Sequence, residues 1–453
     1  MDSVPIAIVG AGLSGLSTSY HLGHSEDAVI FESKDHYGGH IHSEYRDGFT
    51  WDDGPHISFT SNEYVKQLFS EVVDGDYIDL YITATNWFRG HWIDHPAQTS
   101  LWQVPEPLRT QCLESFLEAN DKPTTTPANY QEWLDQAMGP VFAANFPAAY
   151  TRKYWTLEPK QMDVDWIGAR ILRPEREDVI AGAQGPLPES MYYVNTRSSR
   201  YPTNGGFWAY AHKLAAGANI QYGRHLEKVD LKKRVLSFAD GSTVNYERLV
   251  TTTHLRQFIG MVDHVPAEVR DAAEQLLSSQ FWRVDVAIGH EARRPELWFY
   301  VYDEDKVSVR MSRTEAFAPS NAPKGKTGIQ VEVYGSVHKP LPANGAKLAA
   351  KVVDELLEFG LVDSPESVES VAVKRVNTGQ IIYDLNRREA LNIVNRFLDK
   401  HGVERAGRYA EWKYLMTDAC TLSGRRIASR LTGKEDRIDW SGVAITKDDV
   451  PDD

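Results

Sequence analysis

Residues 6–16 read Ile6-Ala7-Ile8-Val9-Gly10-Ala11-Gly12-Leu13-Ser14-Gly15-Leu16. A short apolar run, typical of a buried parallel strand, breaks into Gly10-x-Gly12-x-x-Gly15, and a helical pattern follows. Gly10 permits a tight turn, Gly12 lets backbone approach a pyrophosphate, and Gly15 lets the helix pack closely on the strand. The first helical turn, with Ser14, points unpaired N–H groups at the phosphate. The stretch therefore predicts a dinucleotide site in an α/β fold.

A second apolar run, Ala28–Phe31, ends in Glu32 about twenty residues after the glycines. A carboxylate at this distance can accept hydrogen bonds from the ribose hydroxyls of an adenosine. A glycine turn in an ordinary strand–helix unit would not explain Glu32. The acid therefore strengthens the prediction of a bound dinucleotide.

Composition narrows the class of protein and of partner. The 453 residues are 42% hydrophobic and 25% charged, which is typical of a globular protein, and 63 acidic against 49 basic residues give a net charge of -14. This net negative charge disfavours binding of nucleic acid, and an anionic substrate would need arginines close to it.

Other sequence features bear on compartment, membrane and metal. Cys112 and Cys420 form no disulfide framework, which fits the cytoplasm, and no apolar run approaches the ~18 residues of a membrane span. His91 and His95 are flanked by a glycine and a proline, so no metal site is predicted.

Two further glycine signatures specify the cofactor. Gly38-Gly39-His40 follows Glu32, and Gly407-Arg408 begins a stretch near the C-terminus that ends at Asp418, before a helix with Ser423 and Gly424. The set resembles the fingerprint of FAD proteins in the amine oxidase, protoporphyrinogen oxidase and UDP-galactopyranose mutase superfamily. The resemblance implies FAD as cofactor. It also implies a contact from the backbone of Val229 to adenine, and a cofactor wall built from Gly38, Gly39, His40, Gly407, Arg408 and Asp418.

The same resemblance implies the fold and its divisions. We expect an α/β protein with a discontinuous Rossmann-like FAD-binding domain (1–60, 205–255 and 400–433), a helical lobe (97–176) and a substrate domain (61–96, 177–204 and 256–399) built on a mostly antiparallel sheet. Residues 177–190 read as a loop or lid, since glycines and prolines recur there, and residues 434–453 read as a surface tail.

The loop beside the flavin is expected at Asp53-Gly54-Pro55-His56-Ile57. It resembles the mutase loop in which a histidine after the proline sits close to the isoalloxazine, and His56 matches that histidine. A second histidine normally follows three residues later, where this chain has Phe59. His56 alone could also be a structural histidine.

Resemblance to the mutases also indicates residues for the substrate. Trp155 matches a tryptophan that lines the sugar-nucleotide site, although a core tryptophan fits the pattern equally well. Arg170 or Arg173 would bind a diphosphate through paired hydrogen bonds from its planar guanidinium. The alternative is that this arginine is a solvated surface residue. Arg197 replaces a nucleotide-contacting tyrosine. Arg310 matches an arginine that contacts phosphate and flavin. Tyr383 and Tyr414 match two tyrosines that lie beside the diphosphate.

Two functions remain open at this point. The first is a UDP-galactopyranose mutase-like enzyme that interconverts pyranose and furanose forms of a sugar nucleotide, with N5 of reduced flavin attacking the anomeric carbon. The second is a net FAD-dependent oxidoreductase of the amine oxidase or desaturase type, which Phe59 and Arg197 favour because they remove mutase features. Either way the partner is a small molecule. The sequence leaves the oligomeric state open, and a homodimer is compatible with it.

Overall fold

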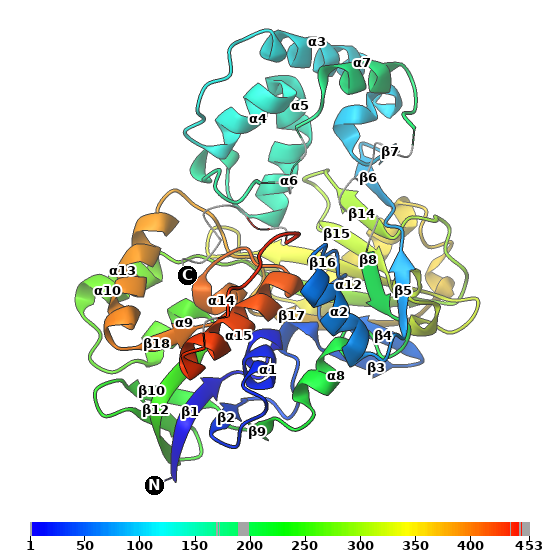
Figure 1. Ribbon diagram of the computed structural model, residues 1–453. Coiled ribbons are helices and arrows are strands. Elements are labelled where there is room, and N and C mark those ends of the chain that lie inside the picture. Colours follow the sequence, from blue (N-terminus) through cyan, green and yellow to red (C-terminus); the bar gives the residue numbers. More distant parts are fainter. Residues whose placement is uncertain are drawn as a thin grey trace.

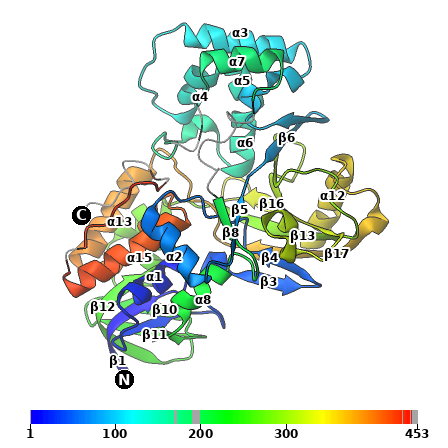
Figure 2. The ribbon, with the colours of Figure 1, turned by 45° about the vertical axis from the view of Figure 1, so that its right-hand side comes forward.

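The computed structural model describes residues 2–168, 171, 173–188, 199–434, 436–443 and 445. The chain forms two seven-stranded sheets, and a lobe of helices stands above them, reached by β6 and β7 of the second sheet (Figure 1). Figure 2 shows the same lobe of helices from a second side, with α6 and β6 between it and the rest of the molecule. The mixed α/β architecture and the discontinuous Rossmann-like unit confirm the predicted fold class.

The first sheet gathers strands from three distant parts of the chain. Its order is β10-β11-β12-β1-β2-β9, with β18 beside β12. The N-terminal strand pairs in parallel with β12 and β2, and its Ala7 and Ile8 are fully buried, as expected for a central parallel strand. The strands are β1 (Asp2–Val9), β2 (Ala28–Phe31), β9 (Asn219–Gln221), β10 (Leu226–Asp230), β11 (Val235–Phe238), β12 (Thr243–Thr251) and β18 (Val403–Arg405).

Small residues let the first and last helices of this unit cross closely. A Cβ on Gly424 of α15 would lie 2.6 Å from the carbonyl oxygen of Ser14 in α1, so only glycine fits there. The Ser17 hydroxyl donates to the Thr421 carbonyl across the same contact (2.6 Å). The C-terminal stretch thereby returns to the N-terminal glycine loop. Helices on this side are α1 (Leu13–His21), α2 (Glu63–Val72), α8 (Ala209–Ala215) and α15 (Thr417–Thr432).

A second group of helices packs beside β10 and β18. It comprises α9 (Leu255–Met261), α10 (Ala267–Glu274) and α13 (Arg387–Lys400), with the short α14 (Arg408–Glu411) next to α9. Within this group α9 contacts β10 and α13 contacts β18. The assignment of residues 256–399 to the substrate domain stays a prediction.

The second sheet has the order β17-β13-β16-β15-β14-β6-β7. All neighbours are antiparallel except the parallel pair β6 and β14, so the mostly antiparallel prediction is confirmed. One face is covered by α12 (Gly345–Glu358), whose N-cap Asn344 accepts from the Lys347 N–H. The strands are β6 (Ala84–Phe88), β7 (His91–Asp94), β13 (Gln280–Ile288), β14 (Trp298–Val301), β15 (Arg310–Arg313), β16 (Thr327–Gly335) and β17 (Val368–Val376).

Two small strand pairs and short helices complete the lower part. The strands β3 (Ser43–Arg46) and β4 (Phe49–Asp52) form a hairpin, and β5 (Tyr77–Leu80) pairs with β8 (Ser199–Pro202). The short helices here are η1 (Gly39–Ile41), α11 (Thr314–Phe317), η6 (Pro319–Asn321) and η7 (Pro365–Ser367).

The helical lobe begins with η2 (Ala97–Thr99) and η3 (Leu101–Gln103) and continues through α3 (Leu108–Asn120), α4 (Tyr130–Met138), α5 (Pro140–Asn145), α6 (Pro147–Tyr154) and η4 (Pro159–Gln161). Residues 177–190 do not all form a loop, because α7 spans Arg176–Gln184 and packs on α3. A Cβ on Gly182 would lie 2.1 Å from the Thr99 carbonyl oxygen, so this glycine marks a close helix contact rather than a lid hinge.

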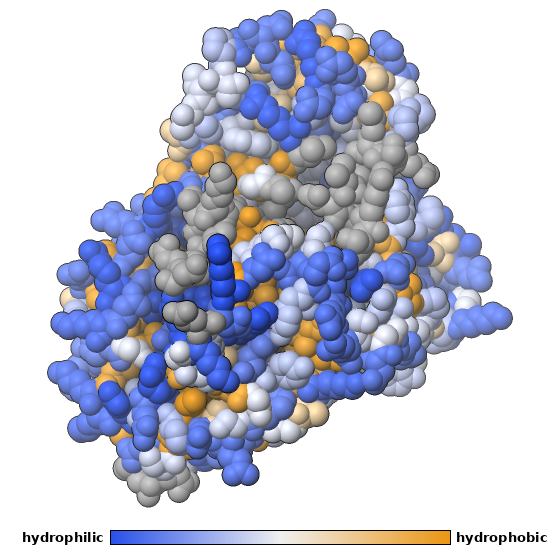
Figure 3. Space-filling model, in the orientation of Figure 1, coloured by the Kyte–Doolittle hydropathy of each residue, from blue (hydrophilic) through white to orange (hydrophobic). Residues whose placement is uncertain are grey.

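The C-terminal segment is more than a surface tail. The Asn62 amide donates to the carbonyls of Asp439 and Ser441 (2.8 and 2.9 Å), and Ser61 N–H donates to the Gly442 carbonyl. The described part of this segment therefore caps the start of α2. Within the described residues, no helix is long and apolar enough to cross a membrane. The face in Figure 3 is mostly hydrophilic, with hydrophobic residues where the lobe meets the lower part.

Candidate cofactor and substrate site

Three glycines around the first loop, Gly10, Gly15 and Gly39, stand where an added Cβ would be crowded. Gly10 has a φ of +102°, and a Cβ there would lie 2.5 Å from Thr252 Oγ1. A Cβ on Gly15 would lie 2.1 Å from the Gly10 carbonyl oxygen, and one on Gly39 would lie 3.0 Å from the Cα of Gly12. Gly12 is the N-cap of α1 and offers no capping side chain. The first-turn N–H groups are thus left for an anionic ligand.

Glu32 ends β2 in a fixed orientation. Its side chain is buried, with Oε2 accepting from the Ala11 N–H (2.7 Å) and Oε1 from the Lys34 N–H (2.9 Å). Oε1 also accepts from the Ser33 hydroxyl (3.2 Å), so Oε2 is the oxygen that can accept a further hydrogen bond. Glu32 therefore links the glycine loop to the strand end and keeps acceptor capacity for a hydroxyl group.

One cavity of about 930 Å³ runs from the glycine loop to the second sheet. It brings together most of the site residues that the sequence indicated. Those lining it are Gly10, Gly12, Ser14, Glu32, Gly38, Gly39, His40, His56, Arg310, Gly407, Arg408 and Tyr414. Gly15 stands behind this wall, at the contact between α1 and β1.

The C-terminal signature forms a second wall of the cavity. Gly407 has a φ of +88°, and a Cβ there would lie 2.1 Å from Ser14 Oγ, so the two ends of the chain meet at this point. Arg408 donates from Nε to the Leu415 carbonyl (2.6 Å) and from Nη1 to Gln380 Oε1 (3.2 Å). Its guanidinium lies 4.8 Å from the ring centre of Tyr414. Arg408 therefore fixes both Tyr414 and the segment before α15.

His56 is held as a neutral imidazole. Its Nε2 lies 2.8 Å from the His40 carbonyl oxygen, and burial lowers the pKa of His56 to about 4. A carbonyl only accepts, so Nε2 carries the proton and Nδ1 is left as an acceptor. Burial likewise lowers the pKa of His40 to about 4. The loop from Asp53 to His56 thus presents an uncharged ring to the cavity near neutral pH.

Arg310 lines the cavity in a tight ion pair. Its Nε and Nη2 donate to Glu332 Oε2 and Oε1 (2.5 and 3.1 Å), and the Tyr334 hydroxyl donates to Glu332 (3.0 Å). The carboxylate of buried Glu332 outweighs desolvation and holds the pKa of Arg310 well above its usual range. The ring of Tyr154 lies 5.7 Å from the guanidinium and 4.6 Å from the ring of Tyr334. Arg310 is therefore part of a charged and aromatic wall.

Two predicted cofactor residues lie outside the cavity. Val229 is paired within the first sheet, and its carbonyl accepts from the Asp263 N–H (2.9 Å), whereas Leu226 lines the cavity. The contact of the Val229 backbone with adenine stays a prediction. Asp418 is buried in the first turn of α15 and accepts from the Ala419 N–H (2.8 Å), while Thr417 and Cys420 line the cavity.

Three predicted substrate residues are also displaced. Trp155 is a buried core residue packed on Trp166, and its neighbour Tyr154 faces the cavity instead. Tyr383 is fully buried; its hydroxyl accepts from the Tyr414 N–H (2.6 Å), and Gln380 takes the cavity position. Arg173 is exposed on the helical lobe, where it reaches the Gln136 carbonyl (3.4 Å). Arg170 and Arg197 lie outside the described residues.

Sequence reasoning missed several residues that the cavity contains. Glu332 and Lys374 line it, as do Tyr154 and Gln380. A signal for Glu332 existed, because a carboxylate in the otherwise apolar run Val331–Val333 needs a cation when it is buried. No comparable signal marks Gln380.

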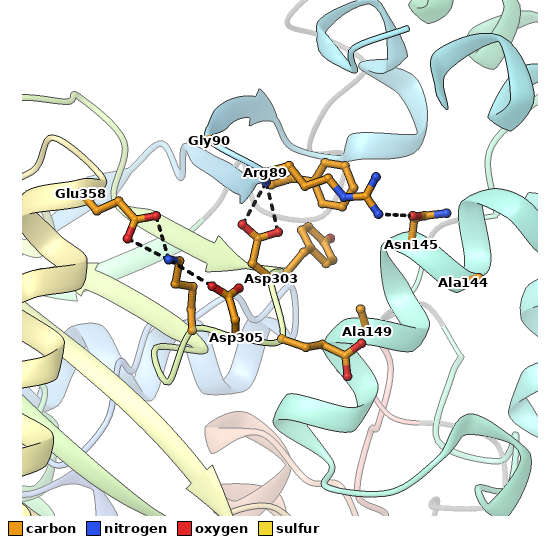
Figure 4. Close-up of a pocket in the computed structure, with 12 residues that line it drawn as sticks. Arg89, Gly90, Ala144, Asn145, Ala149, Asp303, Asp305 and Glu358 are labelled. Carbon is orange, nitrogen blue, oxygen red and sulfur yellow. Dashed lines mark hydrogen bonds and ion pairs between the residues drawn. The ribbon is translucent and has the colours of Figure 1, made fainter. Parts of the chain in front are cut away.

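A smaller pocket of about 570 Å³ lies between the lobe and the second sheet (Figure 4). Its charged groups have partners within the protein. The Asp303 carboxylate accepts from the backbone N–H of Arg89 (2.9 and 3.0 Å), Arg89 Nη2 donates to Asn145 Oδ1 (3.1 Å), and Lys306 pairs with Asp305 and Glu358. We assign no ligand to it.

Among the described residues, one group has the spacing of metal ligands, namely His42, Glu44 and Asp53. The Lys374 ammonium bonds to both carboxylates, at 2.6 Å from Asp53 Oδ1. A cation of the protein thus already occupies the place of a metal, and His91 is exposed and apart from this group.

Comparison with known proteins assigns the N-terminal unit first. Residues 8–72 match the family model described as an NAD(P)-binding Rossmann-like domain. The chain is 60% identical over 37 residues to a lysine-specific histone demethylase 1B homolog of Caenorhabditis elegans, which is 8% of this chain and 4% of that protein. It is 39% identical over 80 residues to a 4,4'-diapophytoene desaturase of Staphylococcus haemolyticus, 17% of this chain and 15% of that one. The matched segments thus cover a small part of these relatives.

Solved structures extend the similarity to nearly the whole chain. The structure of reduced UDP-galactopyranose mutase superposes with a TM-score of 0.88 at 22% identity, over 95% of this chain and 96% of that one. A protoporphyrinogen oxidase-like protein from Exiguobacterium sp. 255-15 gives 0.71 at 16% identity, over 96% and 100%. The chain therefore has the fold of UDP-galactopyranose mutase, and it shares its architecture with the wider group that the sequence indicated.

Proposed function

We propose that this protein is an FAD-dependent enzyme that interconverts ring forms of a sugar nucleotide, as its fold resemblance to UDP-galactopyranose mutase suggests. The observation that carries the proposal is the single cavity that starts at the glycine loop and ends at Arg310 and its aromatic neighbours. A cofactor whose pyrophosphate binds at the glycine loop would have its reactive ring near a substrate that binds at Arg310.

The residues present fit FAD. Gly10 and Gly39 have positive φ and no room for a Cβ, and Gly12 leaves the start of α1 without a side chain, which is the arrangement that a pyrophosphate needs. Glu32 has acceptor capacity for a ribose, and Gly407 brings the C-terminal wall against Ser14. A volume of about 930 Å³ is at the upper end of the range for small-molecule sites, ~300–1,000 Å³. The cavity thus accommodates an elongated ligand together with a second molecule in part.

FAD in its reduced form would supply the nucleophile for the anomeric carbon, as cofactors usually supply the difficult chemistry. The chain's own groups would bind and orient the substrate. Nη1 of Arg310 makes no hydrogen bond to a described residue and can donate to a phosphate oxygen. The rings of Tyr154, Tyr334 and Tyr414 exclude water from this end, which strengthens such a bond. Neutral His56 offers Nδ1 as a hydrogen-bond acceptor.

A net oxidoreductase is the alternative, and two observations favour it. Phe59 lines the cavity where the mutases carry a second histidine. Glu332 occupies two of the three guanidinium nitrogens of Arg310, which weakens its hold on a diphosphate. The short matches to a demethylase homolog and a desaturase are compatible with hydride transfer to flavin.

Both cysteines are unpaired, with Cys112 buried, which supports a reducing compartment such as the cytoplasm.

The first experiment is to purify the protein, denature it and measure the released chromophore. We expect about one FAD per chain. The holoenzyme is then mixed anaerobically with UDP-galactose and, separately, with amines. Binding of UDP-galactose without bleaching supports the mutase proposal; bleaching of oxidised flavin by an amine supports the alternative; a colourless protein that binds no added FAD overturns both.

A further inference from the structure

Charged residues form one continuous row across four strands of the second sheet. Lys374 of β17 stands opposite Arg283 of β13, Arg283 opposite Glu332 of β16, and Glu332 opposite Arg310 of β15. Residues directly opposite in adjacent strands point to the same face of a sheet. Lys374, Glu332 and Arg310 line the cavity, so the row crosses its floor.

Arg283 differs from the other members of the row because it is fully buried. Its Nη1 donates to the Asp52 carbonyl and to Asp53 Oδ1 (2.8 Å each). Its Nη2 donates to Asp285 Oδ2 (2.8 Å) and Glu44 Oε2 (3.2 Å). A buried guanidinium with this many acceptors has one available orientation. Arg283 is thus a rigid anchor that extends from the sheet to the end of β4.

The anchored segment is the one that carries His56. Asp53 shares Oδ1 between Arg283 and Lys374 (2.8 and 2.6 Å), and its N–H donates to the His42 carbonyl (2.9 Å). Gly54 follows with a φ of +156°, and His56 then bonds to the His40 carbonyl. The loop is therefore fixed at one end by the charged row and at the other by the segment after Gly39.

We propose that Arg283 is a positioning residue that sets the Asp53–His56 loop against the flavin, and so couples the floor of the substrate cavity to the cofactor. The inference rests on the proposed binding of FAD. Arg283 acts through Asp53 and touches neither ligand itself. Displacement of Asp53 would move His56 and change both the affinity for the cofactor and the electronic environment of its ring.

The test uses the holoenzyme of Arg283→Met, Arg283→Lys and Asp53→Ala. For Arg283→Met and Asp53→Ala we expect an FAD dissociation constant at least tenfold higher, with a shifted flavin midpoint potential and visible spectrum. Arg283→Lys keeps a charge and should recover part of the shift. The double variant Arg283→Met/Asp53→Ala should shift no further than either single one, because both changes break the same contact. If Arg283→Met does not fold, Arg283→Lys and Asp53→Ala carry the test.

Arg46→Met is the matched control. Arg46 belongs to the outer edge of the same network, where it pairs with Asp285 (3.0 Å) and Glu44 (3.7 Å), and it makes no bond to Asp53. We expect its flavin affinity, potential and spectrum to be unchanged. Equal losses of thermal stability in Arg46→Met and the Arg283 variants, with unchanged flavin properties, would reduce Arg283 to a structural role. Absence of FAD from the wild-type protein would instead overturn the proposed function.

Discussion

Arg310 and Glu332 face each other across β15 and β16 and form a two-point ion pair, with Nε and Nη2 of the arginine on the two carboxylate oxygens. Glu332 is buried, so its charge is weakly screened. The arginine that would bind a phosphate is therefore already neutralised on one side. Substrate affinity should depend on this carboxylate.

We predict that Glu332→Gln binds UDP more tightly, by about tenfold or ~1.4 kcal/mol. Glutamine keeps the shape and one acceptor but removes the negative charge beside Arg310. Titration calorimetry on the oxidised protein gives the dissociation constant. Glu304→Gln is the control, because Glu304 pairs with Arg152 outside this cavity, and it should leave the affinity unchanged. Unchanged or weaker UDP binding by Glu332→Gln would show that Arg310 does not bind phosphate.

Gly15→Ala should abolish FAD binding. The added Cβ would stand 2.1 Å from the Gly10 carbonyl, so α1 must move away from the glycine loop. Gly260→Ala is a matched helical control in α9, where a Cβ would meet nothing within 4 Å. The measurement is the flavin content of each purified variant, which should be lost in Gly15→Ala and kept in Gly260→Ala. Normal FAD content in Gly15→Ala would contradict the close packing on which the cofactor site depends.

Lys153 should anchor the helical lobe to the second sheet. Its buried ammonium, on α6, donates to the carbonyls of Val301, Asp303 and Ser308 (2.8, 2.7 and 2.8 Å). Lys153→Met removes these three hydrogen bonds and leaves the Asp303 carbonyl with the Lys306 N–H as donor, so it should lower the free energy of unfolding by about 3 kcal/mol. Calorimetry should show a lower melting temperature, while exposed Lys351→Met should not. Equal melting temperatures for the two variants would exclude an anchoring role.

Acid should destabilise the protein partly through His56. Burial lowers its pKa from 6.5 to about 4 in the folded state. Between these values the unfolded state binds the extra proton, so the stability due to neutral His56 is full above pH 6.5 and is lost as the pH falls towards 4. The loss is about 3 kcal/mol. Melting temperatures of the wild type should therefore fall more steeply over this range than those of His56→Gln; parallel curves would place the His56 pKa near its ordinary value.

Local chemistry explains what could be predicted from the sequence. The glycine loop depends on neighbours within a few residues, and the helix after it begins at Leu13, as the pattern indicated. Tyr383 was placed in the site, but the irregular segment between β17 and α13 gives no periodicity by which to choose between it and Gln380. The row through Arg283 depends on the register of strands far apart in the chain, which no local pattern determines.

The most direct test of the proposed function is the conversion of UDP-galactofuranose to UDP-galactopyranose. Chromatography measures this conversion for the oxidised protein and again after reduction with dithionite. We predict conversion by the reduced holoenzyme and none by the oxidised one, with no net consumption of reductant. No conversion by protein that holds reduced FAD and binds UDP would contradict the assignment of a sugar-nucleotide mutase.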